Sequence, residues 1–283
     1  MSKSKGNVLY ADTLVDFFGV DAVRYFVLHE MPFENDGVIS WELMVERMNS
    51  DLANILGNLV NRTISMSNKY FGGVVENKGV AEAVDEDLKA VVLEEVKKVD
   101  AKMAQLRVAD AITEIFGIFR RCNKYIDETT PWTLAKDEAK KDRLATVLYN
   151  LTEAITIGAS LLESFMPETS EKILAQLNTK KRELDEMDTF GLYLSGNKVT
   201  DKPEILFARM DIKEVMAKVE EMRAAAAEAA KSAEEAAEDD GIDLEPKAEI
   251  TYDDFAKLQF QIGEIVKCEA VPKSKKLLCS QVK

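Results

Sequence analysis

Apolar residues recur at helical spacing through most of the chain between residues 40 and 177. Two runs show the pattern most plainly: Leu52, Ile55, Leu56, Leu59 and Val60, then Leu88, Val91, Val92 and Val96. Residues three and four positions apart share one face of a helix, so each run predicts a helix with one buried face. Further runs cover residues 109–119 and 144–162, with breaks at Gly72-Gly73, Pro131 and Pro167. The pattern predicts a mainly α fold in which four or five antiparallel helices pack as a bundle.

The segments on either side of this helical stretch differ from it. Residues 1–32 read as a loop followed by short helical patterns, in which we expect Asp12 and Asp21 to act as N-caps. This segment is typical of the tail of a larger domain. Residues 178–208 are polar and irregular, and we expect them to wrap back over the preceding helices.

Two further regions follow. Residues 211–240 are rich in alanine, glutamate and lysine without glycine or proline, which favours a semi-rigid, partly helical spacer. Beyond it the pattern changes to period two: Phe260 and Ile262 alternate with polar neighbours, and Ile265-Val266 and Leu277-Leu278 are candidates for short strands. We expect a β-type domain to begin here and the chain to stop before that domain is complete.

Composition indicates a folded protein and argues against several classes. Of the 283 residues 46% are hydrophobic, which can supply a sizeable core. No apolar run approaches the roughly 20 residues that cross a membrane, and the amino terminus lacks an apolar signal, so we expect a cytoplasmic protein. The cysteines, Cys122, Cys268 and Cys279, have no spacing typical of a disulfide framework or a metal site. We expect the single histidine, His29, to be structural.

The net charge of -14 argues at first against a nucleic-acid partner, because binding to phosphates depends on positive charge. The acidity is concentrated, however. Between Asp211 and Glu249, thirteen acidic and five basic residues contribute -8, which leaves -6 for the rest of the chain. A local basic face elsewhere is compatible with this distribution.

The opening residues 1–7 (MSKSKGN) have the chemistry of phosphate recognition. Lysines supply mobile charges, serines supply hydroxyl donors, and glycine lets the backbone approach a ligand closely. Such a loop could stabilise a phosphoryl or adenylyl-transfer transition state. Taken alone, the same composition is also typical of a disordered amino terminus.

Four segments carry a resemblance to a known family. Residues 1–7 resemble the Lys-Met-Ser-Lys-Ser signature loop of class I aminoacyl-tRNA synthetases without its first lysine, and residues 17–26 (FFGVDAVRYF) resemble the helix that follows that loop. Residues 32–37 (PFENDG) and 51–62 (DLANILGNLVNR) resemble the methionyl member in particular. Over essentially its whole length, the chain is similar to the carboxy-terminal half of a bacterial-type methionyl-tRNA synthetase.

The resemblance implies that Lys3 is a catalytic residue of the ATP-binding loop and steadies the ATP phosphates, with Ser2 and Ser4 supporting the loop. The full enzyme joins methionine to tRNA(Met) with ATP and Mg²⁺. The nucleotide-binding fold, the methionine pocket and any zinc site would lie upstream of Met1. We therefore expect this chain alone to be inactive in aminoacylation and to bind no cofactor stably.

The helical stretch carries a candidate RNA site. Asn58 and Arg62 are four positions apart, so one helix face presents an amide beside a guanidinium. Residues 123–136 (NKYIDETTPWTLAK) place Trp132 directly after Pro131, and an indole at such a corner can stack an unpaired base for roughly 1–3 kcal/mol. From the residues alone, a solvated helix face and a core tryptophan are the more frequent explanations. The resemblance implies instead that Asn58, Arg62 and Trp132 converge on the CAU anticodon.

The carboxy-terminal segments 260–266 (FQIGEIV) and 271–278 (VPKSKKLL) resemble the start of the OB-fold β-barrel found on some methionyl-tRNA synthetases. The resemblance implies that Lys273, Lys275 and Lys276 contact tRNA phosphates with little sequence preference, and that a complete barrel could form a homodimer. An ordinary lysine-rich hairpin turn is the alternative.

The sequence therefore predicts four regions: the end of a class I catalytic domain (1–39), a helical anticodon-binding domain with its wrap-back segment (40–210), an acidic linker (211–248) and the start of an OB-fold (249–283). The predicted partner is tRNA(Met), with no role for DNA or a membrane. Two alternatives are a stand-alone, non-enzymatic tRNA-binding module and an acidic helical scaffold in which the candidate side chains merely pack. The signature loop favours the synthetase.

Overall fold

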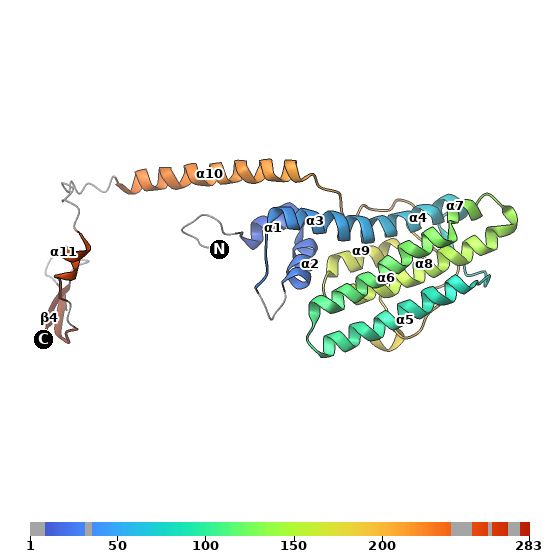
Figure 1. Ribbon diagram of the computed structural model, residues 1–283, viewed down its shortest axis with the longest axis horizontal. Coiled ribbons are helices and arrows are strands. Elements are labelled where there is room, and N and C mark those ends of the chain that lie inside the picture. Colours follow the sequence, from blue (N-terminus) through green and yellow to red (C-terminus); the bar gives the residue numbers. More distant parts are fainter. Residues whose placement is uncertain (1–8, 32–35, 239–250, 260–261, 271–277) are drawn as a thin grey trace. The chain divides into compact units, whose positions relative to one another are not determined.

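The computed structural model describes residues 9–31, 36–238, 251–259, 262–270 and 278–283 (Figure 1). Side chains of residues 230–238, 270 and 278 are also outside the description. The chain divides into two compact units, residues 1–223 and 224–283. In the first unit the longer helices are α1 (Ala11–Phe18), α2 (Val20–Glu30), α3 (Trp41–Arg47), α4 (Asn58–Phe71), α5 (Ala83–Ala104), α6 (Val108–Thr129), α8 (Lys141–Leu162) and α9 (Pro167–Gln176).

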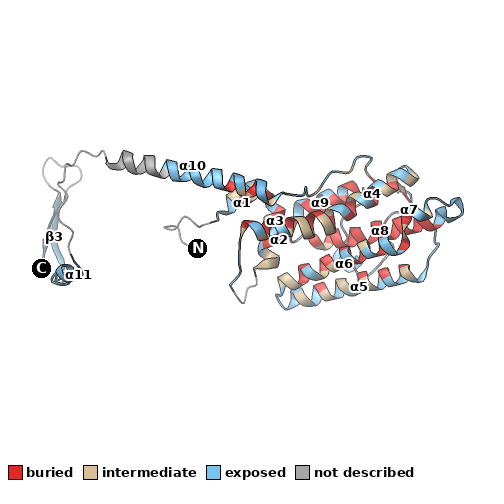
Figure 2. Ribbon diagram, turned by 45° about the horizontal axis from the view of Figure 1, so that its top comes forward, coloured by how far each residue is buried: buried red, intermediate tan, exposed pale blue. Residues whose placement is uncertain are grey.

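Helix α8 forms the centre of the first unit. Its neighbours in the bundle are α4, α5, α6 and α9, and Figure 2 shows that buried residues gather on the surfaces where these helices meet. By length and hydropathy, residues 138–162 could cross a membrane, but 94% of this apolar window is buried inside the protein, as expected for the core helix of a bundle. The predicted mainly α bundle is therefore confirmed.

The breaks read from the sequence coincide with helix ends. Gly72 ends α4 in a left-handed conformation, with φ of 60°, which glycine adopts without strain. Pro131 and Pro167 occupy the first turns of the short helix α7 (Pro131–Leu134) and of α9, where a missing N–H costs nothing.

The predicted N-caps at the amino terminus are wrong. Tyr10 and Gly19 hold the N-cap positions of α1 and α2, so Asp12 and Asp21 are the second residues of their helices. Asp21 is buried and instead accepts a hydrogen bond of 2.6 Å from the backbone N–H of Thr169, in the first turn of α9. The carboxylate thus caps a neighbouring helix rather than its own, which joins α2 to the bundle.

His29 also lies at a helix contact. Its ring stacks on Tyr25 with centroids 5.1 Å apart, and its Nε2 is 3.2 Å from the Thr113 hydroxyl on α6. Its Nδ1 is 2.7 Å from the Glu30 carboxylate. These contacts give His29 a structural place between α2 and α6.

The irregular segment after α9 runs back along the bundle. Residues 197–198 (β2) pair with residues 74–75 (β1), and the Asn68 amide donates to the Thr200 carbonyl over 2.9 Å. Further on, the Asn49 side chain both donates to and accepts from the Met210 backbone, each over 2.9 Å. The buried Glu153 of α8 holds the same segment by accepting from three consecutive backbone N–H groups at residues 191–193.

Helix α10 (Ile212–Glu238) crosses the boundary between the units. The second unit contains α11 (Tyr252–Ala256) and an antiparallel pair of strands, β3 (Ile265–Ala270) and β4 (Leu278–Val282). The strand candidates at Ile265-Val266 and Leu278 therefore lie in strands, whereas Phe260 and Leu277 are outside the described residues. The four proposed domain boundaries stay predictions.

Candidate nucleic-acid interface

Asn58 and Arg62 lie one turn apart on the exposed side of α4, as the sequence predicts for a helix. The Asn58 amide donates weakly to the Asn54 side chain over 3.3 Å, and Asn54 also accepts from Arg209 over 2.5 Å. Within the described part of the chain, Arg62 has no hydrogen bond or ion pair. A guanidinium and an amide therefore share this face with free donors.

The ten residues before α4 form a π-helix, η2 (Met48–Gly57), in line with α3 and α4. A π-helix departs from the usual i to i−4 bonding, and such segments frequently mark functional sites. The Asn123 amide of α6 donates to the Ile55 carbonyl over 2.9 Å and to the Phe119 carbonyl over 3.0 Å. This contact fixes α6 against the segment that carries Asn58.

Trp132 follows a sharp corner. Helix α6 ends at Thr129, and Thr130 adopts a left-handed conformation with φ of 43° and ψ of 63° before the buried Pro131 begins α7. Trp132 is 43% exposed, whereas Trp41 is only 3% exposed and packs beside Phe17 and Phe18 in the core. Trp41 is thus a core tryptophan, and Trp132 presents its ring to solvent.

The corner lies alongside α4. Asn123 contacts η2 at Ile55, and eleven residues further on Leu134 shares a depression of about 180 Å³ with Tyr70 and Phe71 at the end of α4. Helices α6 and α7 therefore run parallel to η2 and α4, and Figure 1 shows α7 beside the end of α4. Trp132 lies on α7, two residues before Leu134, and no hydrogen bond or ion pair joins it directly to Asn58 or Arg62 in the described residues.

Two matches to family models coincide with this organisation. Residues 75–228 match the anticodon binding domain of methionyl tRNA ligase, and residues 1–64 match tRNA synthetases class I (M). The chain belongs to the methionyl-tRNA synthetase family. The first match includes α5 to α9 and hence Trp132, and the second includes Asn58 and Arg62.

Curated relatives and solved structures of the synthetase family agree with the assignment. The chain is 45% identical over 98% of its length to the methionine–tRNA ligase of Clostridium perfringens and 40% identical over 100% of its length to that of Bacillus subtilis. It spans about 42% of the length of either relative. Mycobacterium tuberculosis methionyl-tRNA synthetase bound by methionyl-adenylate is 35% identical with a TM-score of 0.69, over 74% of this chain and 41% of that one.

Several residues named from the synthetase resemblance lie outside the described residues. They are Ser2, Lys3 and Ser4 of the signature loop and Lys273, Lys275 and Lys276 near the carboxy terminus. In the described part of the chain, no three His, Cys, Asp or Glu side chains gather into a possible metal site.

Two further polar side chains, Asn54 and Arg209, lie next to Asn58 on this face and were not predicted from the sequence. Asn54 could have been found from its spacing, because it precedes Asn58 by one helical turn. Arg209 could not, because it reaches Asn54 from 155 positions away through the wrap-back segment.

Proposed function

We propose that this chain binds the anticodon stem-loop of methionine tRNA with the surface formed by η2, α4 and α7. The observation that carries the proposal is the exposed Trp132 beside α4, within a stretch that matches an anticodon-binding domain. Single-stranded RNA loops are recognised by stacking their bases on aromatic rings and by hydrogen bonds to the base edges. The surface offers one aromatic ring and two polar side chains suited to these tasks.

Each side chain has a distinct role. Trp132 stacks one anticodon base, a contact worth roughly 1–3 kcal/mol. Asn58 offers a donor and an acceptor on one amide, and Arg62 offers a planar set of donors. Because Arg62 has no partner in the described residues, it can turn to RNA without breaking an ion pair. Discrimination of the CAU anticodon therefore rests on Asn58 and Arg62, and affinity on Trp132.

Binding of the full chain to a methionine-tRNA anticodon stem-loop tests this proposal. Titrations at two salt concentrations, with CAU and with an altered anticodon, should show preference for CAU at both. Trp132→Ala should weaken binding about 5- to 150-fold, in line with the loss of one stacked base, whereas Trp132→Tyr should retain most of the affinity. Arg62→Gln should reduce the preference for CAU.

Arg107→Gln is the matched control, because Arg107 is an exposed arginine at the opposite end of α6, paired with Asp110. It should leave both affinity and preference unchanged. Equal, weak and purely salt-dependent binding of both stem-loops would contradict the proposal and leave a nonspecific helical scaffold. Replacing Lys273, Lys275 and Lys276 with glutamine should lower the salt dependence without changing the preference, because phosphate contacts carry no sequence information.

We further propose that the protein containing this chain joins methionine to tRNA(Met) in the cytoplasm, using ATP with Mg²⁺. Lys3 would steady the ATP phosphates, with Ser2 and Ser4 supporting the loop, and a complete OB-fold could form a homodimer. The family is one of ATP-using class I synthetases, and one solved relative is bound by methionyl-adenylate.

Residues 1–283 alone should not form methionyl-adenylate, because the class I match covers only residues 1–64. Methionine-dependent exchange of pyrophosphate into ATP by this chain measures the step directly, and we expect no exchange above background. Exchange that disappears on Lys3→Ala would contradict this expectation. Anticodon preference without exchange would also fit a non-enzymatic tRNA-binding module. It would not fit an acidic helical scaffold, because a scaffold would show no anticodon preference.

A further inference from the structure

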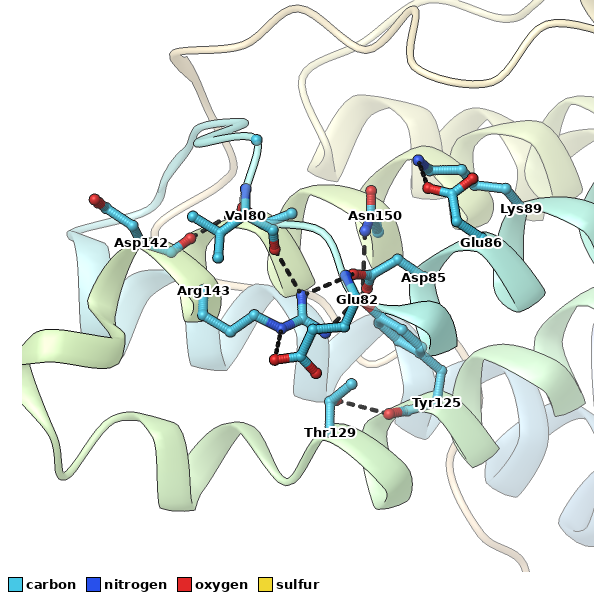
Figure 3. A network of polar contacts seen from close by, with 12 residues as sticks. Val80, Glu82, Asp85, Glu86, Lys89, Tyr125, Thr129, Asp142, Arg143 and Asn150 are labelled. Carbon is cyan, nitrogen blue, oxygen red and sulfur yellow. Dashed lines mark hydrogen bonds and ion pairs between the residues drawn. The ribbon is translucent and has the colours of Figure 1, made fainter.

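A buried cluster joins the two helices that flank the Trp132 corner. Tyr125 lies on the last turns of α6, and Arg143 lies on the first turn of α8, so they bracket the connection of residues 130–140. Both side chains meet Asp85 of α5: the Tyr125 hydroxyl donates to Asp85 Oδ1, and two Arg143 nitrogens lie 3.1 Å from the two carboxylate oxygens (Figure 3). One carboxylate thus holds both ends of the connection.

The cluster is closed to water. Asp85 and Tyr125 are 0% exposed, and Arg143 is 5% exposed. The remaining polar atoms also have partners: Asp85 Oδ2 accepts from the Glu82 backbone N–H over 2.6 Å, and Asn150 donates to the Tyr125 hydroxyl over 3.4 Å. A buried ion pair adds little net stability over apolar packing of the same volume, but it demands a defined geometry. The cluster is therefore better suited to fixing positions than to raising stability.

The Tyr125 hydroxyl keeps its proton in this setting. Burial, and then the hydrogen bond to Asp85, raise the pKa of Tyr125 well above its ordinary value. At neutral pH Tyr125 is therefore protonated and donates to Asp85.

The turn at Thr130, between α6 and α7, is also held by hydrogen bonds to the end of α6. A β-branched residue such as Thr130 rarely adopts a left-handed conformation, and strained residues persist only where their surroundings hold them. The Thr130 N–H donates to the Ile126 carbonyl over 3.0 Å, and the Thr129 hydroxyl donates to the Tyr125 carbonyl over 2.7 Å. Tyr125 is thus linked to Asp85 through its hydroxyl and to the corner through its backbone.

We propose that Asp85, Tyr125 and Arg143 are positioning residues, which hold the connection of residues 130–140 so that Trp132 is oriented to receive an anticodon base. The proposal rests on the proposed function, because it assigns a purpose to the orientation of Trp132. None of the three side chains contacts RNA, since all are buried. Their effect on binding passes through Trp132.

Tyr125→Phe tests the proposal, because it removes one oxygen atom and leaves the ring and the Asp85–Arg143 ion pair in place. Tyr149→Phe is the matched control. Its hydroxyl is also buried, within hydrogen-bond distance of the Gly191 and Tyr193 carbonyls at 2.9 and 2.8 Å, and it supports a different segment. Both variants of the full chain should show similar losses of stability in urea.

The two variants should differ in everything that depends on Trp132. Tyr125→Phe should weaken binding to the CAU stem-loop about fivefold, a part of the loss expected for a missing stacked base. It should also increase quenching of Trp132 fluorescence by acrylamide, while Trp41 stays shielded in the core. Tyr149→Phe should change neither. In a Trp132→Ala background, Tyr125→Phe should have no further effect on binding, because the pathway of its action is already removed.

Three results would overturn the proposal. They are unchanged binding by Tyr125→Phe, an equal loss of binding by Tyr149→Phe, or an additive loss when Tyr125→Phe is combined with Trp132→Ala. If the unmodified chain prefers CAU, each of these results would contradict the positioning role and leave the proposed function intact. An unmodified chain without preference for CAU would instead overturn the proposed function, and the positioning role with it.

Discussion

The two ends of the α5–α6 pair are built differently, although each contains a residue with positive φ, Thr130 at one end and Leu106 at the other. At the Thr130 end, Asp85 of α5 forms polar contacts with Tyr125 and Arg143 inside the protein. At the other, the turn between the helices contains Leu106, which has a φ of 59° and is 77% exposed. Its neighbour Arg107 forms an ion pair with Asp110, but the Arg107 side chain is 53% exposed.

A left-handed residue alone therefore does not indicate a functional site. The Leu106 turn is explained by helix termination: the N–H groups of Leu106 and Arg107 donate to carbonyls at the end of α5, both over 2.9 Å. Thr130 ends α6 in a similar way, but a buried polar cluster holds its surroundings and an exposed tryptophan follows it. The two additional observations, and not the backbone conformation, distinguish the second turn.

The largest difference between the two ends should appear on removal of an arginine. Arg143→Met leaves Asp85 as a buried, unpaired charge, which should lower the free energy of unfolding by about 3–5 kcal/mol. Arg107→Met breaks an exposed pair and should cost only about 0–1 kcal/mol. Urea unfolding of the two variants beside the unmodified chain measures both values.

A double variant separates charge burial from lost packing. Asp85→Leu combined with Arg143→Met removes both charges, so it should recover part of the stability that Arg143→Met alone loses. Equal losses from Arg143→Met and Arg107→Met would mean that water reaches the cluster and that the contrast between the two ends is unfounded.

Much of the fold could be predicted because it depends on local pattern. Helical spacing of apolar residues indicated the bundle, and glycine and proline marked helix ends at Gly72, Pro131 and Pro167 because these residues act on the backbone locally. The N-cap assignments failed for the opposite reason. Asp21 caps α9, and no local pattern reveals that a carboxylate caps a helix 148 positions away.

The candidate site divides along the same line. The residue types and the four-residue spacing of Asn58 and Arg62 could be read from the sequence, as could the corner before Trp132. The π-helix could not, because its apolar spacing is that of an ordinary helix and its Ile55 carbonyl is bonded by Asn123, 68 positions away. The Asp85 cluster was missed because it forms only where three helices meet.

A smaller effect should come from a second carboxyl group on α5, which sharpens the comparison because its surroundings are opposite to those of Asp85. Glu95 faces Glu114 of α6, next to Gly117, and its nearest cation is the partly exposed Lys98, 3.2 Å away. Burial, and then the hydrogen bond with Glu114, raise the pKa of Glu95. Asp85 is matched by an arginine, whereas Glu95 is only partly compensated when ionised.

The raised pKa sets the sign of the pH dependence. The protonated form of Glu95 stabilises the fold, and this contribution is complete below the pKa of the unfolded chain, about 4.3, and is lost as the pH rises through the higher pKa of the folded state. Glu95→Gln removes the ionisation, so it should stabilise the protein at pH 7. The gain should be less than about 1 kcal/mol, because solvent screens a partly exposed group. Near pH 4 the substitution should have almost no effect on stability. Glu94→Gln, at an exposed neighbouring position, changes the net charge equally and is the control in urea unfolding at both pH values. A loss of stability at pH 7 in Glu95→Gln alone would mean that Lys98 compensates Glu95 as fully as Arg143 compensates Asp85, and α5 would then carry two satisfied carboxylates instead of one.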